Sequence, residues 1–325
     1  MANFDIYAAI TDRIIAALEA GTIPWRKPWN GGCRYAISHT TGKPYSLLNQ
    51  LLLGERPGEY LTWKQIHDEG GRVKKGAEAQ FVVFWKMIDK TEEDEDGDKL
   101  TRQIPFLRYF NVFHIDDCEG IKPKYAAETF DPANTPDPIA NAEAVFADYI
   151  RRSGVTFCQD YQDRAFYRPA DDSIHLPLLE QFQDASEYYS TLFHETVHST
   201  GHATRLNRLE NGGGFGSESY SKEELVAEIG AATILNTLGI ESESSFANSA
   251  AYIENWLAVL KNDKRLIVSA AGRAEKAVKL ILNEQPASKP ADEPKPEKQQ
   301  PAPVEMPDKV DSLEAFAALL GASAA

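Results

Sequence analysis

The sequence predicts an α+β protein with two globular domains and an extended C-terminal tail. Two apolar runs at 79–88 and 104–115 are rich in β-branched and aromatic residues, as strands are, and apolar residues recur at helical spacing in most other regular stretches. The chain has 325 residues, about twice the roughly 150 residues of a common domain, and a proline-rich stretch divides it at 127–140. We therefore expect residues 1–126 and 141–284 to fold as separate domains joined by this linker.

The first domain is expected to open with an amphipathic helix from about Phe4 to Ala20, because Ile6, Ile10 and Ile14 recur at helical spacing. The next segment, IPWRKPWNGG at 23–32, is too rich in proline and glycine for a regular element. The elements expected to follow are a helix at 46–53, a helix from about Thr62, a basic loop at 70–79, and the two strands, which are connected by an acidic hairpin tip at 89–98.

The second domain is predicted to be mainly helical, with short strands before its central helix. Asp184 and Glu187 are spaced like a capping box at the start of that helix, and Gly201 is placed to end it. The other predicted elements are a helix at 141–153, strands at 155–158, 164–168 and 173–176, a helix from about Ser221, and helices at 245–261 and 264–282.

The end of the chain is predicted to lack a core of its own. Seven prolines fall between residues 286 and 307, so we expect a disordered tether at 285–310. Residues 311–325 can form a short amphipathic helix, which is marginal alone. It is either a segment that docks on a partner or a frayed tail.

Charge and composition limit the function classes. The net charge is −15, but the first 128 residues hold 17 basic and 19 acidic side chains, seven of the acidic ones at 89–98. The rest of the first domain is therefore mildly basic, which keeps nucleic acid among the candidate partners. No apolar run approaches the ~20 residues of a membrane span, and Asp5 and Asp12 lie where a signal peptide would be apolar, so we expect a cytoplasmic protein.

Three cysteines, Cys33, Cys118 and Cys158, are widely spaced and form no CxxC pair. Neither a disulfide framework nor a cysteine metal site is expected from this pattern.

A metal site is predicted from HETVH at 194–198. Residues four apart share one face of a helix, so His194 and His198 project side by side and can bind one Zn²⁺. Glu195 is then placed to act as the base that takes a proton from water activated by the metal. The alternative is a surface helix with two titratable histidines, because HExxH alone also occurs by chance.

A third ligand is needed, and position 204, where a metzincin would have histidine, is threonine. His202 is a candidate for contact with a ligand or substrate, or for a purely structural role. The better ligand candidates are Glu224 and Glu228 in EELVAEIGAA at 223–232, four apart on one helix face. Glu224 also fits a capping box with Ser221, and a helix-face glutamate such as Glu228 is commonly just solvated.

This pattern resembles the thermolysin-like zinc peptidases (gluzincins), in which a glutamate ligand is followed four residues later by an acid that orients a ligand histidine. The resemblance implies Glu224 as the third ligand and Glu228 as the orienting carboxylate.

A wider resemblance, to the ArdC-type antirestriction proteins of plasmids and other mobile elements, extends over residues 1–283. It implies an N-terminal domain that binds single-stranded DNA and a C-terminal zincin-like metallopeptidase domain. The segments that carry it are IPWRKPW at 23–29, TGKPYSLLNQLLL at 41–53, GGRVKKG at 70–76, YFNVFHIDD at 109–117, YRPADDSIHLP at 167–177, HETVHSTGH at 194–202 and YSKEELVAEIGAA at 220–232.

Single-stranded DNA binding has a physical basis in the first domain. Unpaired bases stack on aromatic rings while lysine and arginine neutralise phosphates. The alternative is that the tryptophans fill the edge of the core and the lysines are only solvated. The candidate DNA contacts are Trp25, Arg26, Lys27, Trp29, Lys43, Tyr45, Arg72, Lys74 and Lys75.

Two function classes follow from the sequence. The first is a DNA-binding zinc peptidase, in which the strand at 173–176 presents its edge to an extended peptide substrate. The second is a non-enzymatic DNA-shielding protein whose peptidase fold is a zinc-binding scaffold. Glu195 favours the first class, because a structural zinc site is normally closed by four protein ligands and needs no base.

Overall fold

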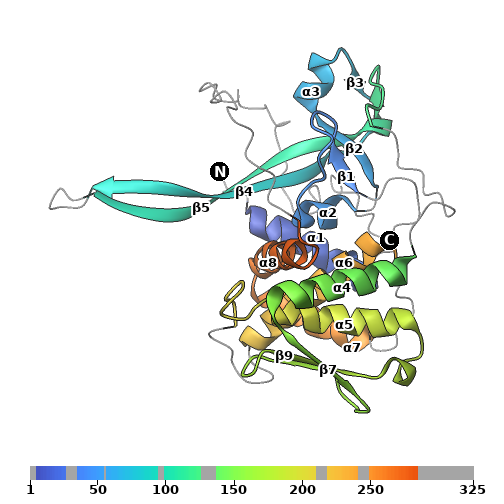
Figure 1. The fold of residues 1–325 in the computed structure, drawn as a ribbon. Helices are drawn as coiled ribbons and strands as arrows, with labels where there is room; N and C mark the ends of the chain where they lie inside the picture. Colours follow the sequence, from blue (N-terminus) through green and yellow to red (C-terminus); the bar gives the residue numbers. More distant parts are fainter. Residues whose placement is uncertain are drawn as a thin grey trace. The chain divides into compact units, whose positions relative to one another are not determined.

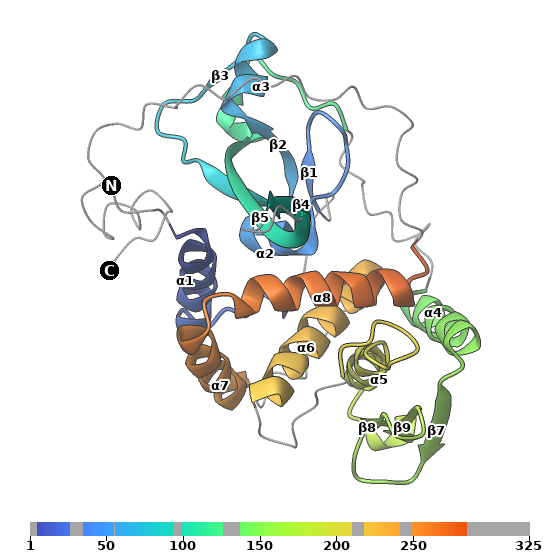
Figure 2. The ribbon, with the colours of Figure 1, turned by 90° about the vertical axis from the view of Figure 1, so that its left-hand side faces the viewer.

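The computed structural model describes residues 5–26, 35–54, 56–93, 99–125, 137–209, 218–240 and 249–284. The chain forms two compact units, whose elements are labelled in Figures 1 and 2. We call residues 38–41 and 59–124 the sheet unit, and residues 1–37, 42–58 and 125–284 the helical unit. The predicted linker at 127–140 is described only from Asp137 onwards, and the predicted tether and tail helix lie outside the described residues.

The sheet unit is built around the predicted hairpin. Its strands belong to a sheet of order β1-β2-β5-β4, and a second, two-stranded sheet pairs β3 with β6. The elements are β1 (Ala36–Ser38), β2 (Gly58–Thr62), α3 (Trp63–Asp68), β3 (Arg72–Val73), β4 (Gln80–Glu93), β5 (Lys99–His114), η2 (Ile115–Asp117) and β6 (Cys118–Glu119). The first residues of β1 and β2, Ala36, Ile37 and Gly58, are counted in the helical unit.

The hairpin strands are longer than the sequence predicted. We expected the first strand to end at 88 and an acidic tip to follow, but β4 continues to Glu93, which pairs with Lys99. Within this extension Lys90 lies opposite Arg102. Backbone hydrogen bonding between the strands continues through this acidic segment, and the amino-acid composition of the segment did not predict it.

The core of the sheet unit lies between α3 and the sheet. Leu61, Ile66 and Ile115 are buried together, and α3 begins with a capping box formed by Thr62 and Gln65. The loop at 38–41 is held by His39, which is fully buried. Its Nδ1 atom lies 2.5 Å from Oε2 of Glu59.

The helical unit contains the predicted central helix and its neighbours. A small sheet of order β7-β9-β8 packs beside α5, and α6 packs against both α5 and α8 (Figure 2). The elements are α1 (Ile6–Glu19), η1 (Pro24–Arg26), α2 (Leu47–Leu53), α4 (Pro138–Ser153), β7 (Thr156–Asp160), β8 (Phe166–Arg168), β9 (Ser173–Pro177), η3 (Leu179–Gln181), α5 (Ala185–Ser199), α6 (Glu218–Leu238), α7 (Ser249–Asn262) and α8 (Leu266–Ile281).

The N-terminal helix α1 forms as predicted, but it packs in the helical unit. Its apolar face buries Ile10, Ile14 and Leu18, and α1 lies against α7 and α8. Thr11 Oγ1 donates a hydrogen bond of 2.7 Å to the carbonyl of Lys264. The compact units therefore do not coincide with the predicted domain boundaries, since helical periodicity shows that a face is apolar but not which element covers it.

Two further differences concern the residues before α5. Helix α4 begins at Pro138, earlier than predicted, because Asp137 accepts a hydrogen bond from the amide of Ile139 and proline suits the first helical position. The predicted exposed edge of the strand at 173–176 is wrong: β9 is the central strand, paired with β7 on one side and β8 on the other.

In the part of the chain that the structure describes, no helix is both long enough and apolar enough to span a bilayer. The longest of the described helices is α6, which carries the candidate ligands Glu224 and Glu228.

Candidate metal centre

Helix α5 brings the two predicted histidine ligands together. Asp184 caps its N-terminus by accepting a 2.8 Å hydrogen bond from the amide of Glu187. His194 and His198 then lie on one face, with their Nε2 atoms 3.1 Å apart. The HExxH spacing therefore produces the predicted side-by-side arrangement.

Helix α6 supplies the carboxylate. Glu224 Oε2 lies 3.4 Å from His194 Nε2, and its Oε1 lies 3.3 Å from His198 Nε2. These three residues form a group whose ligand atoms converge closely enough to hold one ion. Two tetrahedral ligands at about 2.0–2.1 Å from zinc are about 3.3 Å apart, which is close to the distance between the two Nε2 atoms and to the distance from each Nε2 to its nearest Glu224 oxygen.

Close packing of α5 on α6 sets these distances. A Cβ atom added to Gly230 of α6 would lie 2.9 Å from a methyl carbon of Val197 on α5. Val197 lies between Glu195 and His198 in sequence and is fully buried, so Gly230 lets the two helices approach at the level of the site.

The start of α6 removes the competing explanation for Glu224. The helix begins at Glu218, so Ser221 is inside it and is not in the N-cap position. The capping box considered for Ser221 and Glu224 is therefore wrong, and the predicted helix start near Ser221 was late.

Two carboxylates lie behind the histidines. Glu228 Oε1 is 3.9 Å from Nδ1 of His194, close to the position expected for an orienting carboxylate. Glu223 Oε1 is 3.4 Å from Nδ1 of His198, a contact that the sequence alone did not predict. Each histidine thus has an acid on the nitrogen opposite its Nε2, which is the arrangement that fixes the ring of a metal-binding histidine.

Arg208 holds Glu223 in place. Its Nε lies 3.0 Å from Glu223 Oε2 and its Nη2 lies 2.8 Å from Oε1, so the guanidinium binds the carboxylate through both oxygens. The same side chain donates a 2.6 Å hydrogen bond to Thr200 Oγ1 at the end of α5. Both charged side chains are nearly buried, 6% exposed for Arg208 and 12% for Glu223.

The charges of the site favour a cation. Burial alone would lower the pKa of His198, but hydrogen bonds to Glu223 and Glu224 outweigh burial and raise that pKa to about 10. Burial would raise the pKa of Glu224, yet the two histidines hold it well below its usual range. The carboxylates therefore draw positive charge onto the imidazoles, and a divalent cation would satisfy the same demand.

Glu195 is buried on α5, 8% exposed, beside the first histidine in sequence. Its negative charge contributes to raising the pKa of both His194 and His198, after the larger effects of burial and hydrogen bonding. A buried carboxylate that is not itself in the converging group is available for proton transfer.

His202 is held outside the converging group. Its Nδ1 lies 2.9 Å from Thr204 Oγ1 and 4.0 Å from Asp172. Asp172 in turn binds Arg205, which donates a 2.9 Å hydrogen bond to the carbonyl of Ser199. These contacts fix the turn after α5, so they favour the structural role for His202 over the predicted contact with a ligand or substrate.

The described candidate DNA residues are divided between the two units. Trp25 is only 3% exposed and packs in the core of the helical unit, so no base can stack on its ring in this arrangement. The main chain of Arg26 ends η1, while Lys27 and Trp29 lie outside the described residues. Lys43 is exposed in the helical unit, and Tyr45 there is half-buried, with its pKa raised to about 12 by burial.

The other three candidates lie in the sheet unit. Arg72 is exposed but pairs with Glu119, its Nε 2.7 Å from Oε2. Lys74 donates a 2.6 Å hydrogen bond to the carbonyl of Asp116, and Lys75 is exposed.

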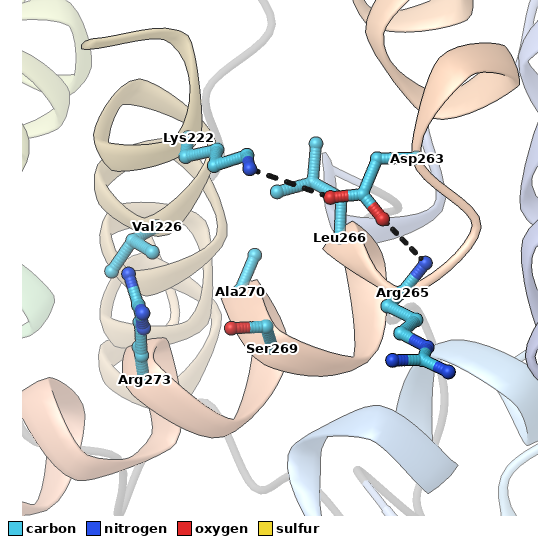
Figure 3. A pocket seen from close by; sticks show the side chains of 8 residues that line it. All are labelled: Lys222, Val226, Asp263, Arg265, Leu266, Ser269, Ala270 and Arg273. Atoms are coloured by element: carbon cyan, nitrogen blue, oxygen red, sulfur yellow. Dashed lines mark hydrogen bonds and ion pairs between the residues drawn. The ribbon is translucent and has the colours of Figure 1, made fainter. Parts of the chain in front are cut away.

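A pocket of about 210 Å³ lies between the start of α8 and α6. Figure 3 shows Lys222 of α6 reaching toward Asp263, which is 3.4 Å from the ammonium group, while Arg273 extends along Val226. None of the candidate metal ligands lines this pocket, so it is separate from the converging group.

Glu223→Gln is expected to weaken metal binding about 10–100-fold, because an orienting carboxylate raises the basicity of the histidine it bonds. The affinity is measured by competition with a chelator. Arg151→Met, which removes an exposed arginine of α4, is the control. Unchanged metal affinity in the Glu223 variant would show that the Arg208–Glu223 pair only stabilises the fold.

Comparison with known proteins matches both halves of the chain. Residues 4–113 match the N-terminal domain of anti-restriction factor ArdC, and residues 141–273 match a zincin-like metallopeptidase domain. The crystal structure of the antirestriction protein ArdC from plasmid R388 is 36% identical, with a TM-score of 0.65 for its metal-free form, over 86% of this chain and 97% of that one. A second structure of that protein is Mn(II)-bound, with a TM-score of 0.66.

Two relatives of different length were also found. DNA primase TraC of Escherichia coli is 36% identical over 293 residues, 84% of this chain, and the chain spans about a quarter of its length, 26%. The uncharacterized protein y4eC of Sinorhizobium fredii is 32% identical over 83% of this chain and 89% of its own.

Proposed function

Because the chain belongs to the ArdC antirestriction family, we propose that it binds single-stranded DNA and hydrolyses peptide bonds at the α5–α6 metal centre. The observation that carries the peptidase half is the convergence of His194, His198 and Glu224, with Glu195 buried on the same helix. The zincin-like domain favours zinc as the ion, and the Mn(II)-bound relative makes manganese the alternative.

His194, His198 and Glu224 would hold the ion, which when bound supplies Lewis acidity to a substrate carbonyl and lowers the pKa of water. Glu195 accepts the proton of the attacking water and delivers it to the leaving amine. Glu228 and Glu223 keep the two imidazole rings turned toward the shared centre.

The strand whose edge would pair with an extended peptide substrate is β8, because β9 has neighbours on both sides. Phe166–Arg168 is an edge strand that packs against α5, the helix that carries the histidines. A peptide adding to this edge would pair its backbone beside the candidate centre.

The second candidate function is a DNA-shielding protein without peptidase activity. The two candidates share DNA binding and differ in whether Glu195 has a chemical task.

The DNA half is tested by reversing the charges of Lys74 and Lys75. The double Glu variant is expected to weaken binding to a labelled single-stranded oligonucleotide about tenfold, and to reduce the slope of log affinity against log salt by about 1.4, since each phosphate contact contributes ~0.7. The single variant Lys75→Glu measures the contribution of Lys75 alone, without breaking the hydrogen bond that Lys74 donates to a carbonyl.

Lys276→Glu is the control for this experiment, because Lys276 is an exposed lysine on α8. If the control and the double variant lose affinity equally, the loss reflects the overall charge of the protein, and the loop at 70–79 is not a DNA contact.

A further inference from the structure

The β4–β5 hairpin extends beyond the rest of its sheet as a two-stranded ribbon. Strand β2 pairs with β5 only from Tyr60 to Thr62, and Thr62 lies opposite Val112. Beyond that point β4 and β5 continue to pair with each other as far as Glu93 and Lys99 (Figure 1). In β4, Phe81, Val82 and Val83 are still buried beyond the end of β2, and Phe84 is the next residue along the strand.

Two phenylalanines become exposed where the ribbon begins. Val82 and Val83 are 6% exposed, but Phe84 is 51% exposed and Phe110 is 46% exposed. Two exposed rings on paired strands form an apolar surface, and an exposed apolar surface is a candidate interaction site.

The strand register places these rings on one face with a cation. Phe84 lies opposite Arg108, and Val82 lies opposite Phe110. Residues opposite each other, and residues two apart along a strand, point to the same side of a sheet. Phe84, Arg108 and Phe110 therefore share a face, and the rings occupy diagonal positions about 7–8 Å apart.

That spacing suits unpaired bases. Stacked groups lie about 3.4 Å apart, so two rings that enclose one base are separated by about twice this rise, which is close to the diagonal distance. A four-stranded sheet that presents aromatic rings on one face is also a common way of binding single strands, because every base has a π-face.

The composition of the exposed surface favours nucleic acid over an apolar protein partner. In the described part of the sheet unit, every exposed large hydrophobic side chain is aromatic: Trp63, Phe84, Tyr109 and Phe110. Arg108 is exposed among them. Aromatic rings interleaved with cations complement bases and phosphates better than they complement an aliphatic groove.

We propose that Phe84, Arg108 and Phe110 form a base-stacking platform for an unpaired DNA strand. The proposal rests on the DNA-binding half of the proposed function and names the surface that performs it. It replaces the role predicted for Trp25, whose ring is buried.

The test measures binding of fluorescein-labelled oligothymidylate to the full chain by anisotropy, at several salt concentrations. Phe84→Ala and Phe110→Ala are each expected to weaken binding about five- to a hundredfold, the effect of losing one stacked base. Their salt slope should stay unchanged, because a ring releases no counterions. Arg108→Gln should instead reduce the slope by about 0.7.

Controls make the outcomes distinguishable. Tyr161→Ala removes a ring that is 80% exposed in the helical unit and should leave binding unchanged, and Phe84→Tyr should retain most of the affinity. Thermal unfolding of each variant checks that the fold is kept. If the wild type binds no oligonucleotide, the proposed function itself fails.

If the wild type binds and the phenylalanine variants bind equally well, the platform is overturned while DNA binding stands. If the variants instead convert a dimer to a monomer in light scattering without loss of affinity, the face is an interface between copies, and the proposal is again overturned.

Discussion

Glu224→Ala is expected to abolish stable metal binding, with the ion content of the dialysed protein falling from about one per chain to near zero. The two histidines that remain cannot hold a divalent ion tightly, because an open zinc site needs three protein ligands. Glu224 also has one oxygen 3.4 Å from Nε2 of His194 and the other 3.3 Å from Nε2 of His198. Metal content by mass spectrometry and the rise of Tm on adding zinc measure the effect.

Glu228→Ala is the matched control, since it removes the same group one helical turn later. Its nearest histidine atom is Nδ1 of His194 at 3.9 Å, not an Nε2, so this variant should bind metal 10–100-fold more weakly but still load when the ion is in excess. The opposite result, a loaded Glu224 variant and an empty Glu228 variant, would exchange the two roles.

The convergence of these ligands was predictable because most of it is local. His194 and His198 come together through helical periodicity alone. The four-residue spacing of Glu224 and Glu228 predicts which face of the second helix is turned toward them. What the residues could not give was how close α5 and α6 approach, which depends on Gly230 fitting against Val197.

The Arg208–Glu223 pair was not predictable for the same reason. Arg208 lies in an irregular segment after α5, where no periodicity assigns a direction to a side chain. Glu223 precedes the ligand glutamate directly, and the doubled acid in EELVAE was the only available signal. Tertiary contacts between a loop and a helix leave little trace in a single sequence.

Composition also could not predict which aromatic side chains are buried and which are exposed. Trp25 and the two phenylalanines of the ribbon are equally apolar, yet Trp25 is in the core and Phe84 is half-exposed. The difference arises from η1 packing on α6, whereas the ribbon extends past β2. Whether a ring is buried or exposed therefore depends on helix packing for Trp25 and on strand pairing for Phe84, and composition predicts neither.

Glu195→Gln is expected to retain the metal and to reduce peptide hydrolysis about 10²–10⁴-fold, the usual contribution of a positioned general base. The amide has the size of the carboxylate, so a side chain that is 8% exposed can be replaced without a cavity. Hydrolysis of a fluorescent unfolded protein by the zinc-loaded chain measures activity, and ion content is measured on the same samples.

Glu254→Gln, an exposed change on α7, controls for loss of a negative charge and should leave both readouts unchanged. A Glu195 variant that binds zinc, unfolds at the wild-type temperature and loses hydrolysis places the chemistry on that carboxylate. Equal hydrolysis by variant and wild type would instead mean a contaminating peptidase. If neither cleaves while both bind zinc and DNA, the carboxylate has no proton to move, and the α5–α6 centre serves only as a scaffold for DNA shielding.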